Sequence, residues 1–539
     1  MGLFSNITLG GLIRFFFMRA VEGTVVLLIV LFLPNIPPFC KFETPYKVSS
    51  TLPLEGKLAV NDKLSEVKFW HKDNIHGPET FASFNGELYT SLQSGEIVKL
   101  TGEQHMSPIV KFGKACKYFE EEVCGRPLGM EFDKSGALFA ADAYYGIYKV
   151  DVKTGTKVQL VSPEVEINGK KPKLFNSIAV ASTGEIYWTD SSTEFALKDG
   201  VFDLLADGSG RVIKYDPKTK RNTVLIDQLH FPNGLLLSKA EDYLIVSVTN
   251  RNALLKYHLK GTKAGQQEVL IDGLPGMPDN INSDGHGGIL VPLVTSHDSS
   301  FPNPIQIFGP FPWMRKLIGR GLGLLEFGFR MVDTVYPNDL AKIGMHLVGH
   351  FSLPTQLLRL SSRTTIVHVS ETGELLGSFH TTNGQVFAIS EAFIHKDELL
   401  LGSPFNEYIG RIPLSKLGLK PLPVAPKVQP TQAPKPTTTQ APKTTTTRPP
   451  TTTTTPPPTT TKKPEQKREV PKQDAPKPTQ APKVTTTTPK PTPKATQAPK
   501  ATPKPTEAKP APTVASKQQQ QAPKTTTKSA EAPSQNNKL

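Results

Sequence analysis

The sequence predicts an all-β fold, a six-bladed β-propeller. Short strand pairs recur between residues 80 and 415, each with alternating apolar residues around a small or polar turn. The pairs follow one another at an irregular spacing of roughly 45–60 residues, on the scale of one propeller blade. Radial repetition protects the edges of the sheets, so we expect the units to surround a central channel. A large β-sandwich or two smaller β domains is the alternative.

The strand pairs differ in length but share the same pattern of Val, Ile, Leu and Tyr. They lie at 86–100, 136–150, 184–215, 242–257, 287–294, and 364–379 with 398–413. Residues 305–350 interrupt this series of strand pairs. Within them Trp313, Met314, Leu317, Ile318 and Leu322 follow helical spacing. We expect a helix that covers one blade; a lid over the channel or a helix that touches the membrane is the alternative.

Residues 23–40 form the predicted membrane segment. These eighteen residues carry no charge, and their length is near the lower limit for crossing about 30 Å of hydrocarbon. The proline-rich sequence after the apolar core is a poor cleavage site, which favours an uncleaved signal anchor over a cleaved signal peptide. Residues 1–22 are then the cytoplasmic N-terminus, and residues 41–420 are the propeller head.

Residues 421–539 form a tail of different composition. They contain 27 of the 50 prolines, 29 threonines and no Phe, Trp or Tyr, so they cannot bury a core. Such Thr/Pro runs are typical of an O-glycosylated, mucin-like stalk; an unmodified disordered tail is the alternative. We expect the partners of such a stalk to be lectins or other surface ligands that bind its glycans.

The positive charge of the chain belongs to this tail. The whole chain has a net charge of +14, whereas the tail has 20 basic and 5 acidic residues. The rest of the chain is therefore almost neutral, which argues against a nucleic-acid-binding face on the head. The tail itself has no aromatic side chains on which bases could stack. No nucleic-acid partner is expected.

The sequence contains three cysteines, Cys40, Cys116 and Cys124. Cys116 and Cys124 are close enough in sequence to close a short loop, which we interpret as a structural disulfide; two reduced thiols are the alternative. A disulfide and a glycosylated tail both require the oxidising side of the membrane. The expected topology is type II, at the cell membrane or a secretory-pathway membrane, with the C-terminal part outside or in the lumen.

Propellers collect ligand groups at the central channel, and five oxygen-bearing residues occur at comparable positions of different strand pairs. These candidates are Glu79, Asn176, Asn233, Asp279 and Asn280. Carboxylate and amide oxygens are the ligands that Ca²⁺ prefers. Taken singly, each Asn is better explained as a turn cap. Taken together at blade spacing, the set predicts a cation site.

Five motifs give the sequence a resemblance to strictosidine synthase-like proteins, and to the adipocyte plasma membrane-associated protein group within them. The motifs are HGPE at 76–79, GRPLGMEFD at 125–133 after the cysteine pair, LFNSIAV at 174–180, FPNGLLLS at 231–238 and MPDNINSDGHGG at 277–288. The resemblance covers about residues 1–415. It implies a six-bladed, calcium-dependent phosphotriesterase-like propeller, related to paraoxonases and gluconolactonases. On this resemblance the calcium ligands of paraoxonases fall on the five candidates, from Glu79 to Asn280.

The resemblance also has departures. Paraoxonases carry a catalytic His in the second blade, where this sequence has Pro127-Leu128-Gly129. Strictosidine synthases use a Glu in the last blade, and here Glu391 is only the nearest acid, so strictosidine synthase activity is not expected. With that His absent, Asp279 is the candidate nucleophile or base.

Structural roles are expected for three further polar residues. His286 and Asp190 are better explained by a turn and a strand-end cap, and His297 is a weaker catalytic candidate than Asp279.

The expected function is that of a membrane-anchored, mucin-like surface protein with a role in adhesion or immune recognition. Its head is a possible calcium-dependent hydrolase of small esters or lactones. The alternative is an active arylesterase or lactonase whose tail is only a spacer.

Overall fold

The computed structural model describes residues 9–299, 301–358 and 363–423. The described chain forms small antiparallel sheets, each built mainly from strands that follow one another in sequence. The sheets are β2–β5 (Phe81–Phe84, Glu87–Ser91, Glu96–Leu100, Met106–Lys111), β6–β9 (Pro127–Phe132, Leu138–Asp142, Gly146–Asp151, Thr156–Val161), β10–β13 (Phe175–Val180, Ile186–Asp190, Gly210–Asp216, Arg221–Leu229), β14–β17 (Pro232–Leu237, Tyr243–Val248, Ala253–His258, Gln267–Ile271), β18–β22 (Gly276–Pro278, Asn282–Ser283, Gly288–Ser296, Thr364–Ser370, Leu375–Thr381), and β23–β25 (Glu391–His395, Glu398–Gly402, Ile409–Pro413) with β1 (Lys68–Trp70). The predicted all-β head with repeated strand pairs is therefore confirmed.

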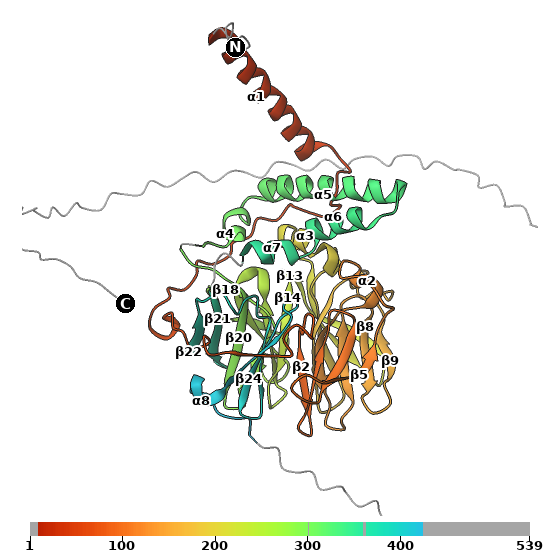
Figure 1. Cartoon of the computed structure of the whole chain (residues 1–539), viewed down its shortest axis with the longest axis vertical. Helices are drawn as coiled ribbons and strands as arrows, with labels where there is room; N and C mark the ends of the chain where they lie inside the picture. The colour runs from red at the N-terminus through yellow and green to blue at the C-terminus, as the bar shows by residue number, and fades with distance from the viewer. Residues whose placement is uncertain (1–8, 300, 359–362, 424–539) are drawn as a thin grey trace, which may run out of the picture. The chain divides into compact units, whose positions relative to one another are not determined.

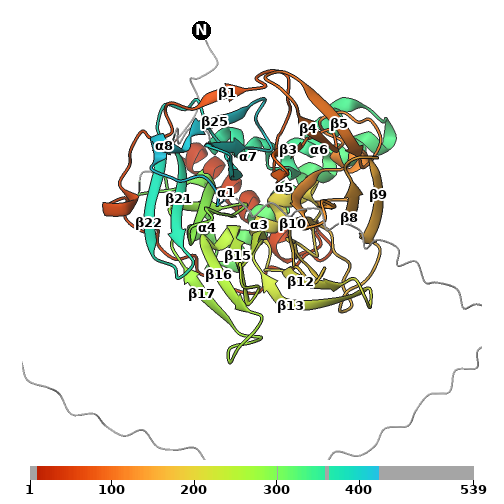
Figure 2. The ribbon, with the colours of Figure 1, turned by 90° about the horizontal axis from the view of Figure 1, so that it is seen from below.

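The sheets surround a common centre, and their first strands approach one another there (Figure 2). Two glycines permit this approach. A Cβ on Gly129 would lie 2.5 Å from the carbonyl oxygen of Asn176, and a Cβ on Gly234 would lie 2.5 Å from that of Asp279. Any larger residue would push neighbouring strands apart at the centre, so these glycines are required by close packing.

The last sheet joins the two ends of the head. Its strand order is β1-β25-β24-β23, with Lys68 opposite Arg411 and Trp70 opposite Ile409. A strand from the start of the head thus completes a sheet made from its end. This pairing closes the ring through backbone hydrogen bonds and covers the edge of β25 at the junction.

An apolar core fills each space between neighbouring sheets. Strand β11 shows how the alternation of the sequence produces this arrangement. Ile186 and Trp188 point to the sheet before it, and Tyr187 points to the sheet after it. Trp188 also stacks on Phe175 of β10, in its own sheet. Both faces of the strand are buried because side chains alternate across a sheet.

Helices gather at one end of the sheets (Figure 1). They are α2 (Glu121–Cys124), α3 (Gly200–Leu205), α4 (Pro304–Phe308), α5 (Pro312–Val335), α6 (Asp339–Gly349) and α7 (Ser352–Leu358), with α8 (Leu414–Leu417) elsewhere and short 3₁₀ turns η1 (Gly56–Leu58), η2 (Leu197–Asp199) and η3 (Thr249–Arg251). The helical spacing predicted within 305–350 is confirmed by α5. Of its residues, Ile318 and Leu322 pack inward, whereas Trp313 is exposed.

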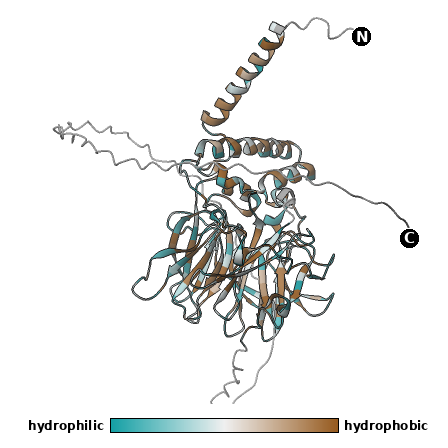
Figure 3. Ribbon diagram, turned by 90° about the vertical axis from the view of Figure 1, so that its left-hand side faces the viewer, coloured by the Kyte–Doolittle hydropathy of each residue, from teal (hydrophilic) through white to brown (hydrophobic). Residues whose placement is uncertain are grey.

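Helix α1 (Leu9–Phe32) is mostly apolar, with hydrophilic residues only in its first two thirds (Figure 3). Within it, 10–32 is long and apolar enough to cross a membrane, with a mean hydropathy of 2.1. The helix shares residues 23–32 with the segment predicted at 23–40. Arg320 of α5 donates hydrogen bonds to the carbonyl oxygens of Val30, Leu31 and Leu33. The guanidinium thus satisfies carbonyl groups that the end of a helix leaves free. Beyond residue 423, the predicted tail lies outside the described residues.

Candidate functional site

A cavity of about 110 Å³ lies at the centre of the sheets, beneath the helices. Four of the five predicted ligand residues line it: Glu79, Asn176, Asn233 and Asp279. Each comes from the start of a different sheet. Asn176 and Asn233 lie on β10 and β14, whereas Glu79 precedes β2 and Asp279 follows β18. The shared register of the first strands brings together residues up to 200 positions apart.

The fifth predicted residue, Asn280, lies on the other side of this cluster. It lines a second cavity of about 390 Å³ together with Glu391. Its amide nitrogen donates to Oε1 of Glu79 at 3.5 Å. Asn280 therefore connects to the central cavity through Glu79. Glu391, the acid nearest to the family position in the last blade, faces the second cavity and accepts a hydrogen bond from Asn282.

The amide nitrogens of the cluster are occupied, and several oxygens are not. Asn176 donates to Ser191 Oγ at 3.0 Å, and Asn233 donates to Asp279 Oδ1 at 2.5 Å. Within the described residues, Asn233 Oδ1 and Glu79 Oε2 are buried without a hydrogen-bond partner. Buried polar atoms normally have hydrogen-bond partners, so these two oxygens are available as ligands of a cation.

The raised pKa values of the carboxyl groups in this cluster also favour a cation site. Burial raises the pKa of Glu79 to about 7, against the attraction of Arg126, whose guanidinium lies 3.8 Å away. Burial and the charge of Glu79 raise the pKa of Asp279 well above its usual value. Burial also raises the pKa of Glu391 to about 8. The attraction of a guanidinium thus acts on Glu79, whereas burial and the charge of Glu79 raise the pKa values of Asp279 and Glu391.

The residues fit a hard cation such as Ca²⁺. Two carboxyl groups and the amide oxygens provide the oxygen ligands that Ca²⁺ prefers. Among the described residues, no three His, Cys, Asp or Glu side chains are placed to hold a metal. A cation here would therefore depend on the asparagine oxygens, which excludes the donor sets typical of zinc.

The wall of the cavity is mostly apolar, and part of it comes from the helical segment. Phe351, Pro354 and Thr355, from the start of α7 and the residue before it, line the cavity together with Leu128 and Phe231. Of residues 305–350, His350 lines this cavity, and the role of the segment as a cover of one blade or as a lid stays a prediction. Leu128, from the stretch Pro127-Leu128-Gly129, contributes to this apolar wall.

Three ionisable residues of this cavity were not predicted from the sequence: Glu121, Arg126 and His350. Two signals were available for them. Glu121 lies between Cys116 and Cys124, and Arg126 belongs to the GRPLG motif. His350 had no such signal, because the sequence does not specify where the helical segment returns to the sheets.

The other candidates have structural contacts. The backbone of His286 donates to Asp284 in a turn. His297 is buried beside Thr295, and burial lowers its pKa to about 4. The Asp190 carboxylate pairs with Arg211. Because none of these three side chains lines the central cavity, the structure gives them roles in folding.

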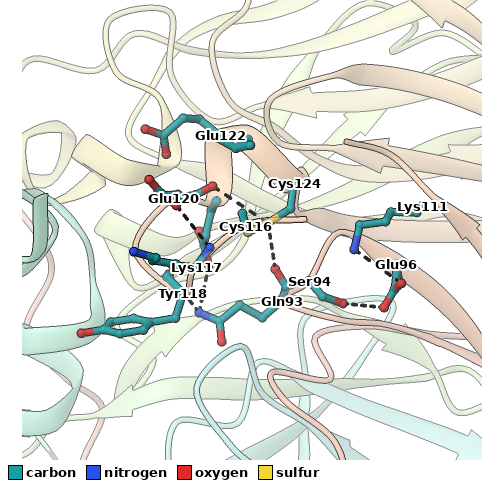
Figure 4. The surroundings of a disulfide bond; sticks show 12 residues. Gln93, Ser94, Glu96, Lys111, Cys116, Lys117, Tyr118, Glu120, Glu122 and Cys124 are labelled. Atoms are coloured by element: carbon teal, nitrogen blue, oxygen red, sulfur yellow. Dashed lines mark hydrogen bonds and ion pairs between the residues drawn. A yellow bond between two sulfur atoms is a disulfide. The ribbon is translucent and has the colours of Figure 1, made fainter. Parts of the chain in front are cut away.

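Cys116 and Cys124 form a disulfide, as predicted (Figure 4). The bond closes the loop that carries Glu121, and Cys124 Sγ lies 3.6 Å from the carbonyl oxygen of Gln93. Cys40 is a free cysteine. The disulfide thus fixes the segment from which Glu121 enters the cavity.

Removing this disulfide should destabilise the head measurably. We expect Cys116→Ser with Cys124→Ser to lower the free energy of unfolding by about 2–3 kcal/mol, because the unfolded chain regains the entropy of the open loop. Chemical denaturation of the variant and the wild type measures the difference. Cys40→Ser is the control and should have a smaller effect; an equal loss in both variants would contradict the prediction.

The fold and the site define a strictosidine synthase-like β-propeller protein. Residues 176–262 match the strictosidine synthase family model, and residues 56–100 match that of the N-terminal part of strictosidine synthase-like proteins. The chain belongs to the adipocyte plasma membrane-associated protein family. It is 41% identical over 409 residues to the adipocyte plasma membrane-associated protein Hemomucin of Drosophila melanogaster, covering 75% of this chain and 70% of that protein.

Vertebrate members and solved structures give further comparisons. The adipocyte plasma membrane-associated protein of Gallus gallus is 33% identical over 372 residues, covering 67% of this chain and 81% of that protein. A gluconolactonase structure from Xanthomonas campestris aligns with a TM-score of 0.41 and 14% identity, covering 71% of this chain and 99% of that one. The family resemblance seen in the motifs is confirmed by the sequence relatives.

Proposed function

We propose that this chain is a membrane-anchored surface protein whose head is a calcium-dependent ester or lactone hydrolase. In this proposal the sheets are the six blades of a calcium-dependent phosphotriesterase-like propeller, and the tail is an O-glycosylated, mucin-like stalk. The observation that carries it is the central cavity, where buried oxygens of Glu79 and Asn233 lack partners beside the buried carboxyl group of Asp279.

Glu79, Asn176, Asn233 and Asp279 would hold the ion, with Asn280 supporting Glu79. Bound Ca²⁺ would polarise the oxygen of an ester or lactone, as a Lewis acid does. The apolar wall around Phe231 and Phe351 would bind the hydrocarbon part of a substrate and exclude bulk water. Asp279 is the proposed nucleophile or base, because it combines deep burial with a position on the cavity wall.

The proposed location is the cell membrane or a secretory-pathway membrane, in type II orientation. It is supported by the apolar helix α1, the disulfide in the head and the membrane-associated relatives. The mucin-like tail is supported by its composition and by the name of the relative Hemomucin. Lectins or other surface ligands are the proposed partners of its glycans. A loss of mass after enzymatic removal of O-glycans tests the stalk; an unchanged mass would reject it.

Hydrolysis of phenyl acetate and of a simple lactone by the full chain in detergent micelles tests the enzyme. We expect activity with Ca²⁺, its loss in EDTA, and a loss of at least about 10²-fold in Asp279→Ala. Asp227→Ala removes an exposed carboxylate on β13 and should leave activity unchanged. A folded, calcium-loaded protein that is inert on every ester and lactone would contradict the hydrolase and favour a purely structural ion.

A further inference from the structure

Three side chains outside the predicted ligand set are connected at the edge of the central cavity. His350 Nε2 lies 3.4 Å from Glu121 Oε2. On the other side of the ring, His350 Nδ1 lies 2.6 Å from the hydroxyl oxygen of Ser352. An acid, an imidazole and a hydroxyl in this order are the parts of an activated nucleophile.

The local backbone determines which imidazole nitrogen carries the proton. The backbone N–H of Ser352 donates to His350 Nδ1 at 3.3 Å. Nδ1 is therefore an acceptor, and in the neutral ring the proton is on Nε2, which faces Glu121. It follows that the Ser352 hydroxyl donates to Nδ1. The proton of the hydroxyl is already directed at a basic nitrogen.

The Glu121 carboxyl group is suited to hold the imidazole. Burial disfavours its charge, but the contact with His350 and the charge of Arg126 act against burial, and the pKa of Glu121 is lowered. Its other oxygen accepts from Gln93 Nε2 at 3.4 Å. The carboxylate therefore stays ionised and orients the ring from a segment that the disulfide closes.

His346 completes the surroundings of Ser352. Its ring stacks on His350 with centroids 4.3 Å apart, and its Nε2 lies 3.3 Å from Ser352 Oγ. Burial and the neighbouring His350 lower the pKa of His346 to about 4. It is thus neutral at physiological pH and supports the position of the hydroxyl group.

The position of Ser352 makes it reachable. Glu121 and His350 are buried and line the central cavity, whereas Ser352 is half-buried and lines an outer depression of about 890 Å³. Thr355 and Phe405 line both spaces. A hydrophobic ester can therefore approach the hydroxyl from the outer depression, where Phe405 offers an apolar contact.

We propose that Ser352 is a catalytic nucleophile for hydrophobic carboxylic esters, with His350 as its base and Glu121 as a positioning residue. Ser352 Oγ attacks the ester carbonyl carbon as its proton passes to His350 Nδ1. The tetrahedral intermediate releases the alcohol, which takes the proton back, and leaves an acyl ester on Ser352. Water then hydrolyses this ester with the same base. The choice of substrate rests on the proposed function, but the step itself uses no calcium ligand.

A fluorophosphonate probe tests the nucleophile on the full chain in detergent micelles. Ser352 Oγ should attack phosphorus, fluoride should leave, and the proton should pass to His350. We expect one label per chain on the peptide that contains Ser352, formed in EDTA as well as in Ca²⁺. Ser352→Ala should abolish it. Ser94→Ala, in the same depression but bonded to Glu96, should label like the wild type.

The base and the positioning residue have separate tests. His350→Ala should label about 10²-fold more slowly, and added imidazole should restore part of the rate. Glu121→Gln should also slow labelling without changing the labelled residue. If Ser352→Ala does not fold, Ser352→Cys replaces it, and iodoacetamide should alkylate the new thiol faster than in the same variant with His350→Ala.

The outcomes separate this inference from the proposed function. Labelling of another residue, or equal labelling of Ser352→Ala, would overturn the nucleophile. Ester hydrolysis that depends on Ca²⁺ and Asp279 but persists in Ser352→Ala would keep the calcium hydrolase and reject Ser352. Labelling at Ser352 without any effect of calcium on hydrolysis would keep Ser352 as the nucleophile and reject the calcium-dependent hydrolase.

Discussion

Without calcium, the carboxyl groups of the central site should destabilise the head as the pH rises from about 4.5 to about 8, and calcium should offset most of this effect at pH 8. Burial raises the pKa of Glu79 to about 7 and that of Glu391 to about 8. A carboxyl group whose pKa is raised by folding favours the fold while it is protonated. Its contribution is complete below the unfolded pKa and is lost as the pH rises through the folded pKa.

The size of the expected loss of stability follows from the raised pKa of Glu79. A change from 4.5 to about 7 corresponds to about 3 kcal/mol, at roughly 1.4 kcal/mol for each pKa unit. Asp279 adds to the loss, because its pKa is raised by burial and by the charge of Glu79. A cation bound between these two carboxylates would stabilise their ionised forms. Its binding should therefore stabilise the fold more at pH 8 than at pH 5.

Thermal unfolding of the full chain at pH 5 and pH 8, in EDTA and in Ca²⁺, measures this effect. Asp142 and Asp203 also have raised pKa values, through burial, but neither belongs to the ligand set. They contribute equally in EDTA and in Ca²⁺, so the difference between the two series isolates the site. Asp279→Asn should reduce that difference. An equal effect of calcium at both pH values would contradict the account.

Arg211→Met should destabilise the head by roughly 3–5 kcal/mol, because it leaves a buried carboxylate without its partner. Asp190 and Arg211 face each other across β11 and β12, and both side chains are almost fully buried. Nε and Nη2 of Arg211 donate to the same carboxylate oxygen at 3.0 and 2.6 Å. Burial alone raises the pKa of Asp190 against the attraction of Arg211.

A double variant identifies the cause of the stability lost in Arg211→Met. Asp190→Asn with Arg211→Met removes the charge as well as its partner, so it should be more stable than Arg211→Met alone. Chemical denaturation at pH 8 gives the three free energies of unfolding. If the double variant is as unstable as the single one, the loss comes from the missing packing and from the Arg211 bond to the Ile167 carbonyl oxygen, and the ion pair is not the main contribution.

The sequence predicted those parts of the fold that depend on local alternation. Strands such as β11 alternate between two cores, so their pattern shows in the sequence. The pairing of β1 with β25 could not be predicted, because it joins residues more than 300 positions apart and has no local signal. The two ends of the head meet only when all the sheets are in place.

The candidate site was predictable to the extent that its residues repeat from sheet to sheet. Asn176 and Asn233 occupy the same place on successive first strands, and the structure brings both to one cavity. His350 follows no repeat, because it comes from an insertion within one sheet. Its contacts with Glu121 and Ser352 depend on how α6 and α7 return over the sheets. Periodicity contains no information about that path.

Calcium binding to the full chain, measured by isothermal titration calorimetry in detergent micelles at pH 8, tests the central claim most directly. The account predicts one saturable Ca²⁺ site per chain in the wild type. Asn233→Leu and Asp279→Asn should each weaken binding by at least about tenfold, which is the effect of losing roughly 1.4 kcal/mol of ligand energy. Saturable binding that is unchanged in both variants, or no saturable binding to the folded wild type, would contradict it.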